Sequence, residues 1–403
     1  MVDDIAGEIA RQIEALELKR EVTPGQSVAV ACSSRGIANY AEIVSAVVAG
    51  LKHLGLDPFL VPAMGSHGSA SAEGQKRVLE AYGLTADRVG APIRSSLDVD
   101  PIGETPDGVP VCIDRYAHCA DHIVLINRIK QHTEFEHEIE SGLMKMLGIG
   151  LGKEEGATLY HKAIMVYGYP RVITTVASTV LQTGKILFGV GLVENGLAQT
   201  AHVATATADS LEATEKESLK LAKKLAPRLP FEEADVLIID EMGKDVSGSG
   251  FDTKVVGRIL MPLLAEEPAS PRIKRIVVCD LTDKTAGNAD GIGIADFCTR
   301  RLVDKIDFSA LHANALAGAE PEHARIPLTL DTDSCAIQAA IDSVGLIPTE
   351  ELKVIRIRNT MQLERMQVSS AYLDAARQSE QLEILGPPEP LAMDPEGNLR
   401  PLD

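Results

Sequence analysis

The chain has little aromatic character and no tryptophan. Of its 403 residues, only 7 are Phe and 7 are Tyr. Proteins that bind single-stranded nucleic acid stack bases on exposed rings, so this composition disfavours such a platform. Basic residues are also scarce, 39 against 58 acidic residues, and the net charge is -19. Because an acidic chain repels polyphosphates and no basic stripe offsets the repulsion, we expect no nucleic-acid partner.

Long hydrophobic runs and cysteine pairs are missing as well. No unbroken apolar run reaches the roughly 18 residues that indicate a membrane span. The first 22 residues alternate charged and apolar side chains at helical spacing, which is not the pattern of a signal peptide. Six cysteines occur without a CxxC pair, so we expect reduced, mostly buried thiols. These absences predict a soluble cytoplasmic protein that makes no membrane contact.

What the sequence does contain is an alternation of apolar strands with amphipathic helices. Strands that are separated by helices pair in parallel through right-handed crossovers, which predicts α/β layers. We expect strands at 27–32, 57–64, 121–127, 185–195, 235–240, 273–280 and 353–359. We expect helices at 37–54, 71–82, 209–225, 254–265, 291–305 and 333–345.

The length allows two domains with separate cores. The stretch "APRLPFEEA" after a charged helix suggests a boundary near residue 228. We therefore predict two α/β domains with mainly parallel sheets and an active-site cleft between them. Residues 1–227 would form the catalytic and cofactor-binding domain, and 228–403 would form the domain that closes the cleft. The proline-rich tail from about residue 386 is expected to be irregular.

Polar side chains follow the first two predicted strands. Ser33, Ser34 and Arg35 stand between a strand and a helix, where helix N–H groups favour a carboxylate or phosphate. His67 lies between two glycines after the second strand. The simpler alternatives are a capped helix with a surface arginine and a solvated loop histidine.

The stretch 132–161, "HTEFEHEIESGLMKMLGIGLGKEEGATLYH", is the most unusual part of the sequence. It holds three histidines, a lysine inside an apolar run and a ladder of glycines. Glycines at this density cost backbone entropy unless another group approaches the main chain closely. "GIGLGK" has neither Walker nor GxGxxG spacing, and "HEIES" lacks the second histidine of HExxH. Common nucleotide and zinc motifs are therefore disfavoured.

"SGLMK", followed sixteen residues after its lysine by the histidine of "YH", and preceded by "SSRG" and "GSHG", resembles the nickel-dependent lactate racemase family. The resemblance covers most of residues 25–260 and implies a racemase or epimerase of 2-hydroxyacids. It also implies a nickel-pincer nucleotide, that is, pyridinium-3,5-dithiocarboxylic acid mononucleotide with nickel. Such a cofactor would be attached covalently at Lys145 and would have His161 as its nickel ligand. The glycines between these two residues would then let the main chain close on the nucleotide. Separate cofactor-maturation enzymes would be required as partners.

The resemblance assigns roles to further positions. His67 and His132 match the family's two acid/base histidines, and Arg35 matches the arginine that anchors the substrate carboxylate. The surrounding motifs add Ser33, Ser34, Ser141 and Gly142 as cofactor contacts.

The departures from the family concern the substrate more than the cofactor. Three extra residues separate His132 from Lys145, which leaves His137 as a rival for the second base. Cys32 replaces an aspartate. In the second domain Lys254 and Arg258 are the candidates to replace the family's substrate-holding side chains. We therefore expect a substrate other than, or broader than, lactate, namely another 2-hydroxyacid or an aldonic acid.

Other interpretations remain open. One is a zinc or iron hydrolase that uses His132, His137 and His161 with a nearby glutamate as base. Another is a non-catalytic protein that binds small acids. In a third, Lys145 extends from a buried helix to solvent and His161 only packs. Whether the protein forms a homodimer is also left open.

Overall fold

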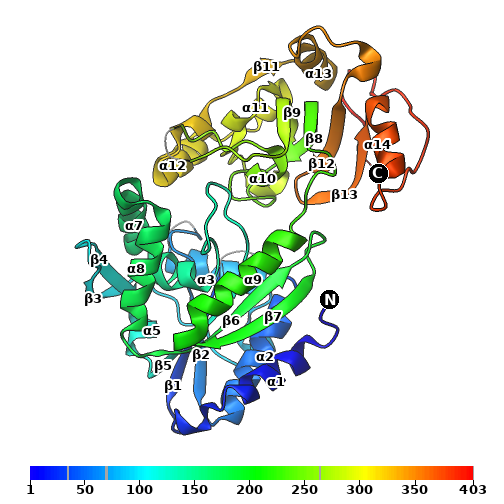
Figure 1. Cartoon of the computed structure of the whole chain (residues 1–403). Coiled ribbons are helices and arrows are strands. Elements are labelled where there is room, and N and C mark those ends of the chain that lie inside the picture. Colours follow the sequence, from blue (N-terminus) through cyan, green and yellow to red (C-terminus); the bar gives the residue numbers. More distant parts are fainter. Residues whose placement is uncertain (34–35, 69–70, 263–264, 403) are drawn as a thin grey trace. The chain divides into compact units, whose positions relative to one another are not determined.

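The computed structural model describes residues 1–403 except 34–35, 69–70, 263–264 and 403. The chain divides into two compact units. The first comprises residues 1–132 and 136–226, and the second comprises 133–135 and 227–403. Each unit is built on its own sheet with helices packed against it (Figure 1). The predicted pair of α/β domains with mainly parallel sheets is confirmed.

The first unit has a five-stranded sheet in the order β2-β1-β5-β6-β7. All neighbours are parallel except β7, which runs antiparallel to β6. The chain leaves β1 for β2 on one side and later returns to β5 on the other, so the strand order reverses at β1. Loops beyond the carboxyl ends at such a reversal are the usual place for ligands. The strands are β1 (Ser27–Cys32), β2 (Asp57–Pro62), β5 (His122–Arg128), β6 (Ile186–Glu194) and β7 (Thr200–Thr207), with a separate hairpin of β3 (Val99–Glu104) and β4 (Pro110–Asp114).

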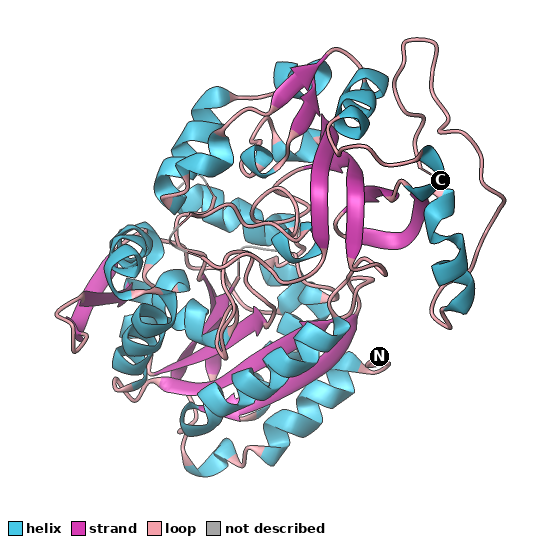
Figure 2. Ribbon diagram, turned by 45° about the horizontal axis from the view of Figure 1, so that its top comes forward, coloured by secondary structure: helices cyan, strands magenta, loops and turns pink. Residues whose placement is uncertain are grey.

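Helices cover this sheet because its strands are apolar on both faces. The core on one side joins α1 (Ile5–Ala15) and α2 (Tyr40–His53) to the strands. On the other side α9 (Leu211–Leu225) lies along β6 and β7 (Figures 1 and 2). The remaining helices are α3 (Ala72–Ala81), α4 (Ala86–Val89), α5 (Arg115–Cys119), α6 (Leu143–Lys145), α7 (Lys153–Tyr167) and α8 (Tyr169–Leu181).

The second unit has a six-stranded sheet in the order β11-β10-β9-β8-β12-β13. Only β13 is antiparallel to its neighbour. The strands are β8 (Glu233–Met242), β9 (Arg272–Leu281), β10 (Phe297–Thr299), β11 (Leu328–Leu330), β12 (Val354–Asn359) and β13 (Gln362–Val368). The helices are α10 (Thr253–Val256), α11 (Arg300–Asp304), α12 (Phe308–Gly318), α13 (Asp333–Asp342) and α14 (Leu373–Gln378).

Two predicted helices of the second unit are wrong in extent. The helix expected at 254–265 is the short α10, which ends because Gly257 adopts a φ of 65°. A side chain at Gly257 would also collide with the Pro271 carbonyl, 1.7 Å from the position of its Cβ. The helix expected at 291–305 is β10 followed by the short α11. The apolar run there belongs to a buried strand, which periodicity alone does not distinguish from a helix.

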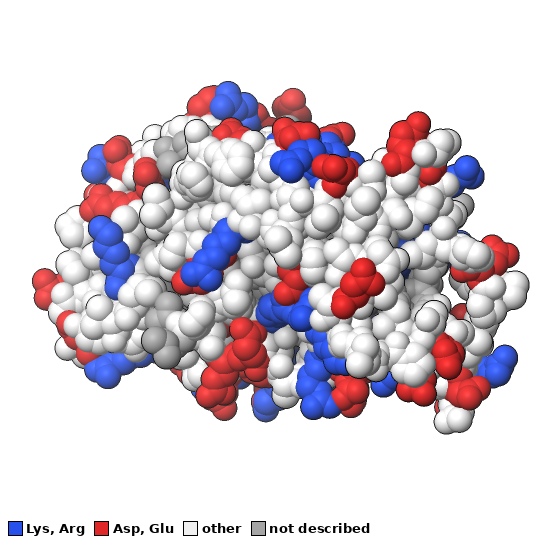
Figure 3. Space-filling model, turned by 90° about the horizontal axis from the view of Figure 1, so that it is seen from above, with Lys and Arg blue, Asp and Glu red and all other residues white. Residues whose placement is uncertain are grey.

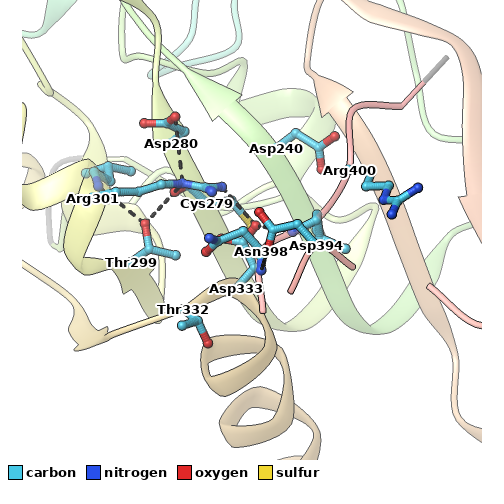
Figure 4. Close-up of polar contacts among 12 residues, drawn as sticks. Asp240, Cys279, Asp280, Thr299, Arg301, Thr332, Asp333, Asp394, Asn398 and Arg400 are labelled. Carbon is cyan, nitrogen blue, oxygen red and sulfur yellow. Dashed lines mark hydrogen bonds and ion pairs between the residues drawn. The ribbon is translucent and has the colours of Figure 1, made fainter. Parts of the chain in front are cut away.

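The proline-rich tail is mostly irregular but is tied firmly to the second sheet. Met393 and Leu399 form an isolated bridge. The N–H of Leu399 donates to the buried carboxylate of Asp333 at 2.7 Å, and Arg301 pairs with the same carboxylate at 2.8 Å (Figure 4). Figure 4 also shows Asp240, which Arg356 binds through two hydrogen bonds of 2.7 and 2.8 Å. The tail therefore completes a buried network of charges.

Charge on the surface is mixed in sign. On the face that Figure 3 shows, basic and acidic side chains are interspersed, and the coloured residues there form no broad basic area. No helix in the described part of the chain is both long and apolar enough to cross a membrane. Of the six cysteines, all unpaired, four are buried while Cys119 and Cys335 are exposed.

Candidate active site

A closed loop follows β5 in the first unit. Lys130 and Ser141 pair through their backbones, which joins the two ends of the loop. Inside it the fully buried carboxylate of Glu140 accepts the backbone N–H groups of His132 at 2.6 Å and His137 at 3.0 Å. Lys223 of α9 neutralises this carboxylate at 2.6 Å. Burial by itself lowers the pKa of Lys223, but the hydrogen bonds and charges of Glu140 and Glu136 together outweigh burial and raise this pKa.

The loop places His132 against Lys145. The distance from Nζ of Lys145 to Nε2 of His132 is 3.1 Å. The ring of Tyr169, the first residue of α8, contacts both side chains. Its centroid is 5.0 Å from the centroid of His132 and 5.6 Å from Nζ of Lys145. The hydroxyl of Tyr169 donates to the Glu140 carbonyl at 3.0 Å, which fixes the ring. The two residues that the resemblance paired, thirteen positions apart, are thus brought together.

His137 stands differently. Its side chain is exposed, and its Nδ1 accepts the N–H of Ile139 at 3.4 Å. The geometry therefore places His132, rather than His137, beside Lys145.

The segment after Lys145 is a π-helical turn, Met146–Gly150, in which the N–H of Leu151 donates to the carbonyl of Met146 at 2.9 Å. Such turns are frequent at functional sites. The loop after β2, which carries His67, rests on this turn. Gly65 donates its N–H to the carbonyl of Gly150 at 3.2 Å.

His67 itself is exposed at the end of that loop. Its Nδ1 lies 2.8 Å from the carbonyl of Met64. Because a carbonyl only accepts, Nδ1 carries the proton, and in the neutral ring the lone pair is on Nε2. The backbone therefore sets a tautomer in which Nε2 can act as a base.

A buried lysine, Lys153, supports the loop that carries His67. Lys153 is fully buried and donates to Gln75 at 3.0 Å, while Gln75 donates to the carbonyls of Gly65 at 2.8 Å and His67 at 3.3 Å. Lys153 also pairs with the fully buried Asp114 at 3.0 Å. Desolvation lowers the pKa of Lys153 even though Asp114 opposes the shift.

Glu215 supports the Lys145 segment from α9. Its carboxylate accepts the N–H of Met144 at 2.8 Å and lies against Gly142, where a Cβ would be 2.6 Å from the carboxylate carbon. Asn127 donates to the carbonyl of Gly142 at 2.7 Å. Complete burial raises the pKa of Glu215 to about 7, although backbone donors partly oppose the shift.

The glycine ladder has an explanation within the chain. A Cβ at Gly150 would lie 2.8 Å from the Ala63 carbonyl, at Gly152 2.7 Å from the Gly148 carbonyl, and at Gly156 2.9 Å from the ring of Tyr160. The protein's own atoms therefore fill the space beside these glycines. The interpretation that they make room for a nucleotide gains no support, because it is the π-turn and the His67 loop that pack there.

The remaining predicted site residues of the first unit lie as follows. His161 is half-buried on α7. Ser33 is buried, and its N–H donates to the hydroxyl of Tyr40 at 2.7 Å. Ser141 serves the bridge that closes the loop. Ser34 and Arg35 lie outside the described residues.

In the second unit Lys254 is half-buried on α10. Arg258 pairs with Asp296 at 3.0 Å and donates to the Ile294 carbonyl at 2.9 Å and the Ile273 carbonyl at 3.3 Å. These contacts tie loops together within the unit. They leave the prediction that Arg258 holds the substrate without support.

A metal site made of protein ligands alone also gains no support. Across the described ranges, no three His, Cys, Asp or Glu side chains come close enough to hold a metal ion. A zinc or iron site of His132, His137 and His161 would need such a group.

Sequence reasoning missed Glu140, Tyr169, Glu215 and Lys153. Each is a buried polar or aromatic side chain with at least one partner that lies about 30 residues or more away along the chain. The one available signal was Glu140, a single glutamate between the apolar Ile139 and "SGLM", where an unpaired charge would be costly.

Comparison with known families gives the decisive observation. Residues 2–170 match the model of the lactate racemase N-terminal domain. The resemblance that the motifs suggested is confirmed over these residues, which include His67, His132, Lys145 and His161. This likeness indicates an isomerase of the racemase class.

Two solved structures are similar to the chain. A protein from Thermotoga maritima has a TM-score of 0.51 and 13% identity, over 68% of this chain and 70% of that one. The lactate racemase apoprotein from Thermoanaerobacterium thermosaccharolyticum has a TM-score of 0.48 and 12% identity, over 85% of each chain. The first likeness concerns the fold alone, and the second, with its lower TM-score, adds no support. Comparison with curated proteins finds no match.

Proposed function

We propose that the protein racemises or epimerises a 2-hydroxyacid other than, or broader than, lactate by reversible hydride transfer. The observation that carries this proposal is the 3.1 Å contact between Lys145 and His132 inside a lactate racemase N-terminal domain. It supports the alignment of the motif despite the three extra residues between the two positions. The substrate would be a small 2-hydroxyacid or an aldonic acid.

The residues present suit a lysine-bound nickel-pincer nucleotide. The contacts of Lys145 described above are an imidazole and an aromatic ring, a setting in which its amine can serve as a covalent attachment point. His161, sixteen residues later on α7, would ligate nickel, since a neutral imidazole is a good nickel donor. Ser33, Ser34, Ser141 and Gly142 would complete the cofactor contacts. When bound, such a cofactor would supply the hydride acceptor and donor.

The chain's own residues would handle protons and orientation. His67, with its lone pair on Nε2, and His132 would act from opposite faces of the substrate. One would remove the hydroxyl proton as hydride leaves, and the other would return a proton when hydride comes back to the opposite face. Arg35 would bind the substrate carboxylate through a planar, bidentate pair. Lys254 would be a further substrate contact.

The test is a screen for loss of optical purity. The protein would be produced together with cofactor-maturation enzymes and incubated with single-enantiomer 2-hydroxyacids and aldonic acids. At least one should racemise or epimerise, and Lys145→Ala should be inactive. Intact-mass measurement should show a cofactor-sized adduct that Lys145→Ala lacks. An active protein with unmodified Lys145 would refute the assignment.

A further inference from the structure

The contact between Lys145 and His132 poses a chemical question that comes before any turnover. A lysine at neutral pH is an ammonium ion, which is not a nucleophile. To form an amide-type bond its nitrogen must lose two protons, one before it attacks and one as the C–N bond forms. Nε2 of His132 lies 3.1 Å from that nitrogen, within hydrogen-bond reach of a general base.

We propose that His132 is the base that takes a proton from Lys145 when this lysine forms its covalent bond to a thiocarboxylate. The inference rests on the proposed function, because it concerns the attachment of the cofactor. It gives His132 a task in maturation that is separate from its task in the racemisation cycle.

The step balances without an oxidant or reductant. The nitrogen of Lys145 attacks the carbonyl carbon of the thiocarboxylate, so that a C–N bond forms and the C–O bond breaks. The two protons that leave the ammonium nitrogen end on the departing oxygen, which leaves as water. The product is a thioamide. His132 would accept one proton from nitrogen and pass it to that oxygen.

Three features of the structure hold His132 in place for this task. Its backbone N–H is fixed by the buried Glu140 at 2.6 Å. Its ring packs on Tyr169, with the two planes inclined at 48°. The same Tyr169 ring lies 5.6 Å from Nζ of Lys145, so one aromatic ring contacts both the amine and the imidazole. His137, exposed on the same loop, provides a matched control histidine.

The experiment needs neither cofactor nor substrate. Protein made without maturation enzymes would be treated briefly with acetic anhydride at one fixed pH near neutrality. Acetylation of Lys145 would be measured by peptide mass spectrometry relative to the exposed Lys19 in the same sample. This electrophile also forms a C–N bond and releases acetate. The same measurement would be made on His132→Gln, His132→Ala and His137→Ala.

A positioned general base contributes roughly 10²–10⁴-fold, so we expect the Lys145-to-Lys19 ratio to fall at least about tenfold in His132→Gln and His132→Ala. The ratio should not change in His137→Ala. Glutamine keeps a hydrogen-bonding group near Lys145 but is not a base. A lower ratio in His132→Gln therefore reports the loss of proton transfer and not the loss of the contact that positions Lys145. Added imidazole should restore the ratio in His132→Ala and leave the wild type unchanged.

A ratio in His132→Gln equal to that of the wild type would overturn the inference. So would a failure of imidazole to rescue His132→Ala. Neither result would touch the proposed function, which depends on the adduct in protein made with maturation enzymes. If instead the labelling depends on His132 and no adduct ever forms on Lys145, the proposed function fails on its own test.

Discussion

The carboxylate of Glu140 accepts the backbone N–H of His132 at 2.6 Å, with no exposure to solvent on the acceptor side. Replacing it by glutamine in Glu140→Gln removes the charge that Lys223 and two N–H groups share. Since a hydrogen bond to a charged group contributes roughly 1.5–3 kcal/mol, we expect unfolding to become easier by about that amount. Hydrogen exchange at His132 and His137 should accelerate.

The matched control is Glu138→Gln on the same loop. Glu138 is largely exposed and pairs with Lys216 at 3.1 Å, so its loss should change stability by less than about 1 kcal/mol. Equal effects of the two substitutions, measured by denaturant titration, would show that Glu140 does not organise the loop.

Glu215 should make stability depend on pH. Burial raises the pKa of this acid from 4.5 to about 7, so the folded state favours the protonated form. The resulting stabilisation is full below the unfolded pKa and is lost as pH rises from about 4.5 through about 7. Glu215→Gln cannot ionise and should reduce the fall in stability between about pH 5 and about pH 8, by roughly 3 kcal/mol at most.

Glu217→Gln on the same helix serves as the comparison, because Glu217 is exposed and pairs with Lys220 at 2.7 Å. Its pH profile of unfolding should match that of the wild type. If Glu215→Gln also follows the wild-type profile, the carboxylate is ionised in the folded state throughout this range.

A double-mutant cycle can measure the interaction energy between the buried side chains of Lys153 and Asp114. Lys153→Met leaves Asp114 charged in the core, and losing one partner of a buried pair costs roughly 3–5 kcal/mol. Replacing both residues, Lys153→Met with Asp114→Leu, should cost less than Lys153→Met alone. Urea unfolding would measure each variant, and a strictly additive double variant would contradict the pairing.

The two loop histidines should differ in catalysis. Measured per molecule that carries the Lys145 adduct and nickel, His132→Ala should lower the racemisation rate by roughly 10²-fold or more, the usual contribution of a general base. His137→Ala should keep nearly full activity because its side chain is exposed. Polarimetry together with metal analysis would decide. The reverse order of effects would move the second base to His137.

The C-terminal tail should stabilise the second unit. A chain that stops after Pro390 loses the N–H that Leu399 donates to Asp333 and the carbonyl of Arg400 that accepts from Arg356. We expect a loss of roughly 2–5 kcal/mol in urea unfolding, because both partners are buried charged groups. A chain that stops after Arg400 keeps these contacts and should unfold like the full protein.

The sequence predicted the regular parts of the fold because they follow from local patterns. The apolar run 27–32 is β1, and the periodic stretch 37–54 contains α2. The errors came where a single long-range contact decides the outcome, as at Gly257 against Pro271. The antiparallel β13 was missed because its side chains are exposed or half-buried, so it lacks the apolar run by which the other strands were predicted.

The candidate site shows the same difference between what local patterns predict and what depends on distant contacts. Spacing and motif predicted Lys145 and His132, which do meet. The supports behind them, Glu140, Glu215 and Lys153, could not be predicted, because a buried charge reveals its purpose only when its partner is known. Burying a single charged side chain is costly, whereas burying it together with a partner is tolerated. Which residues become partners is seen only in the three-dimensional structure.

The backbone contact between Gly65 and Gly150 has a consequence for any attempt to redesign this enzyme. Where two backbone segments are in direct contact, no side chain lies between them that could change its rotamer to accommodate a shift of either segment. A substitution that shifts one of these loops will therefore displace the other, and with it the spacing of His67 from Lys145. Substitutions meant to change the substrate preference are better placed in segments outside this backbone contact.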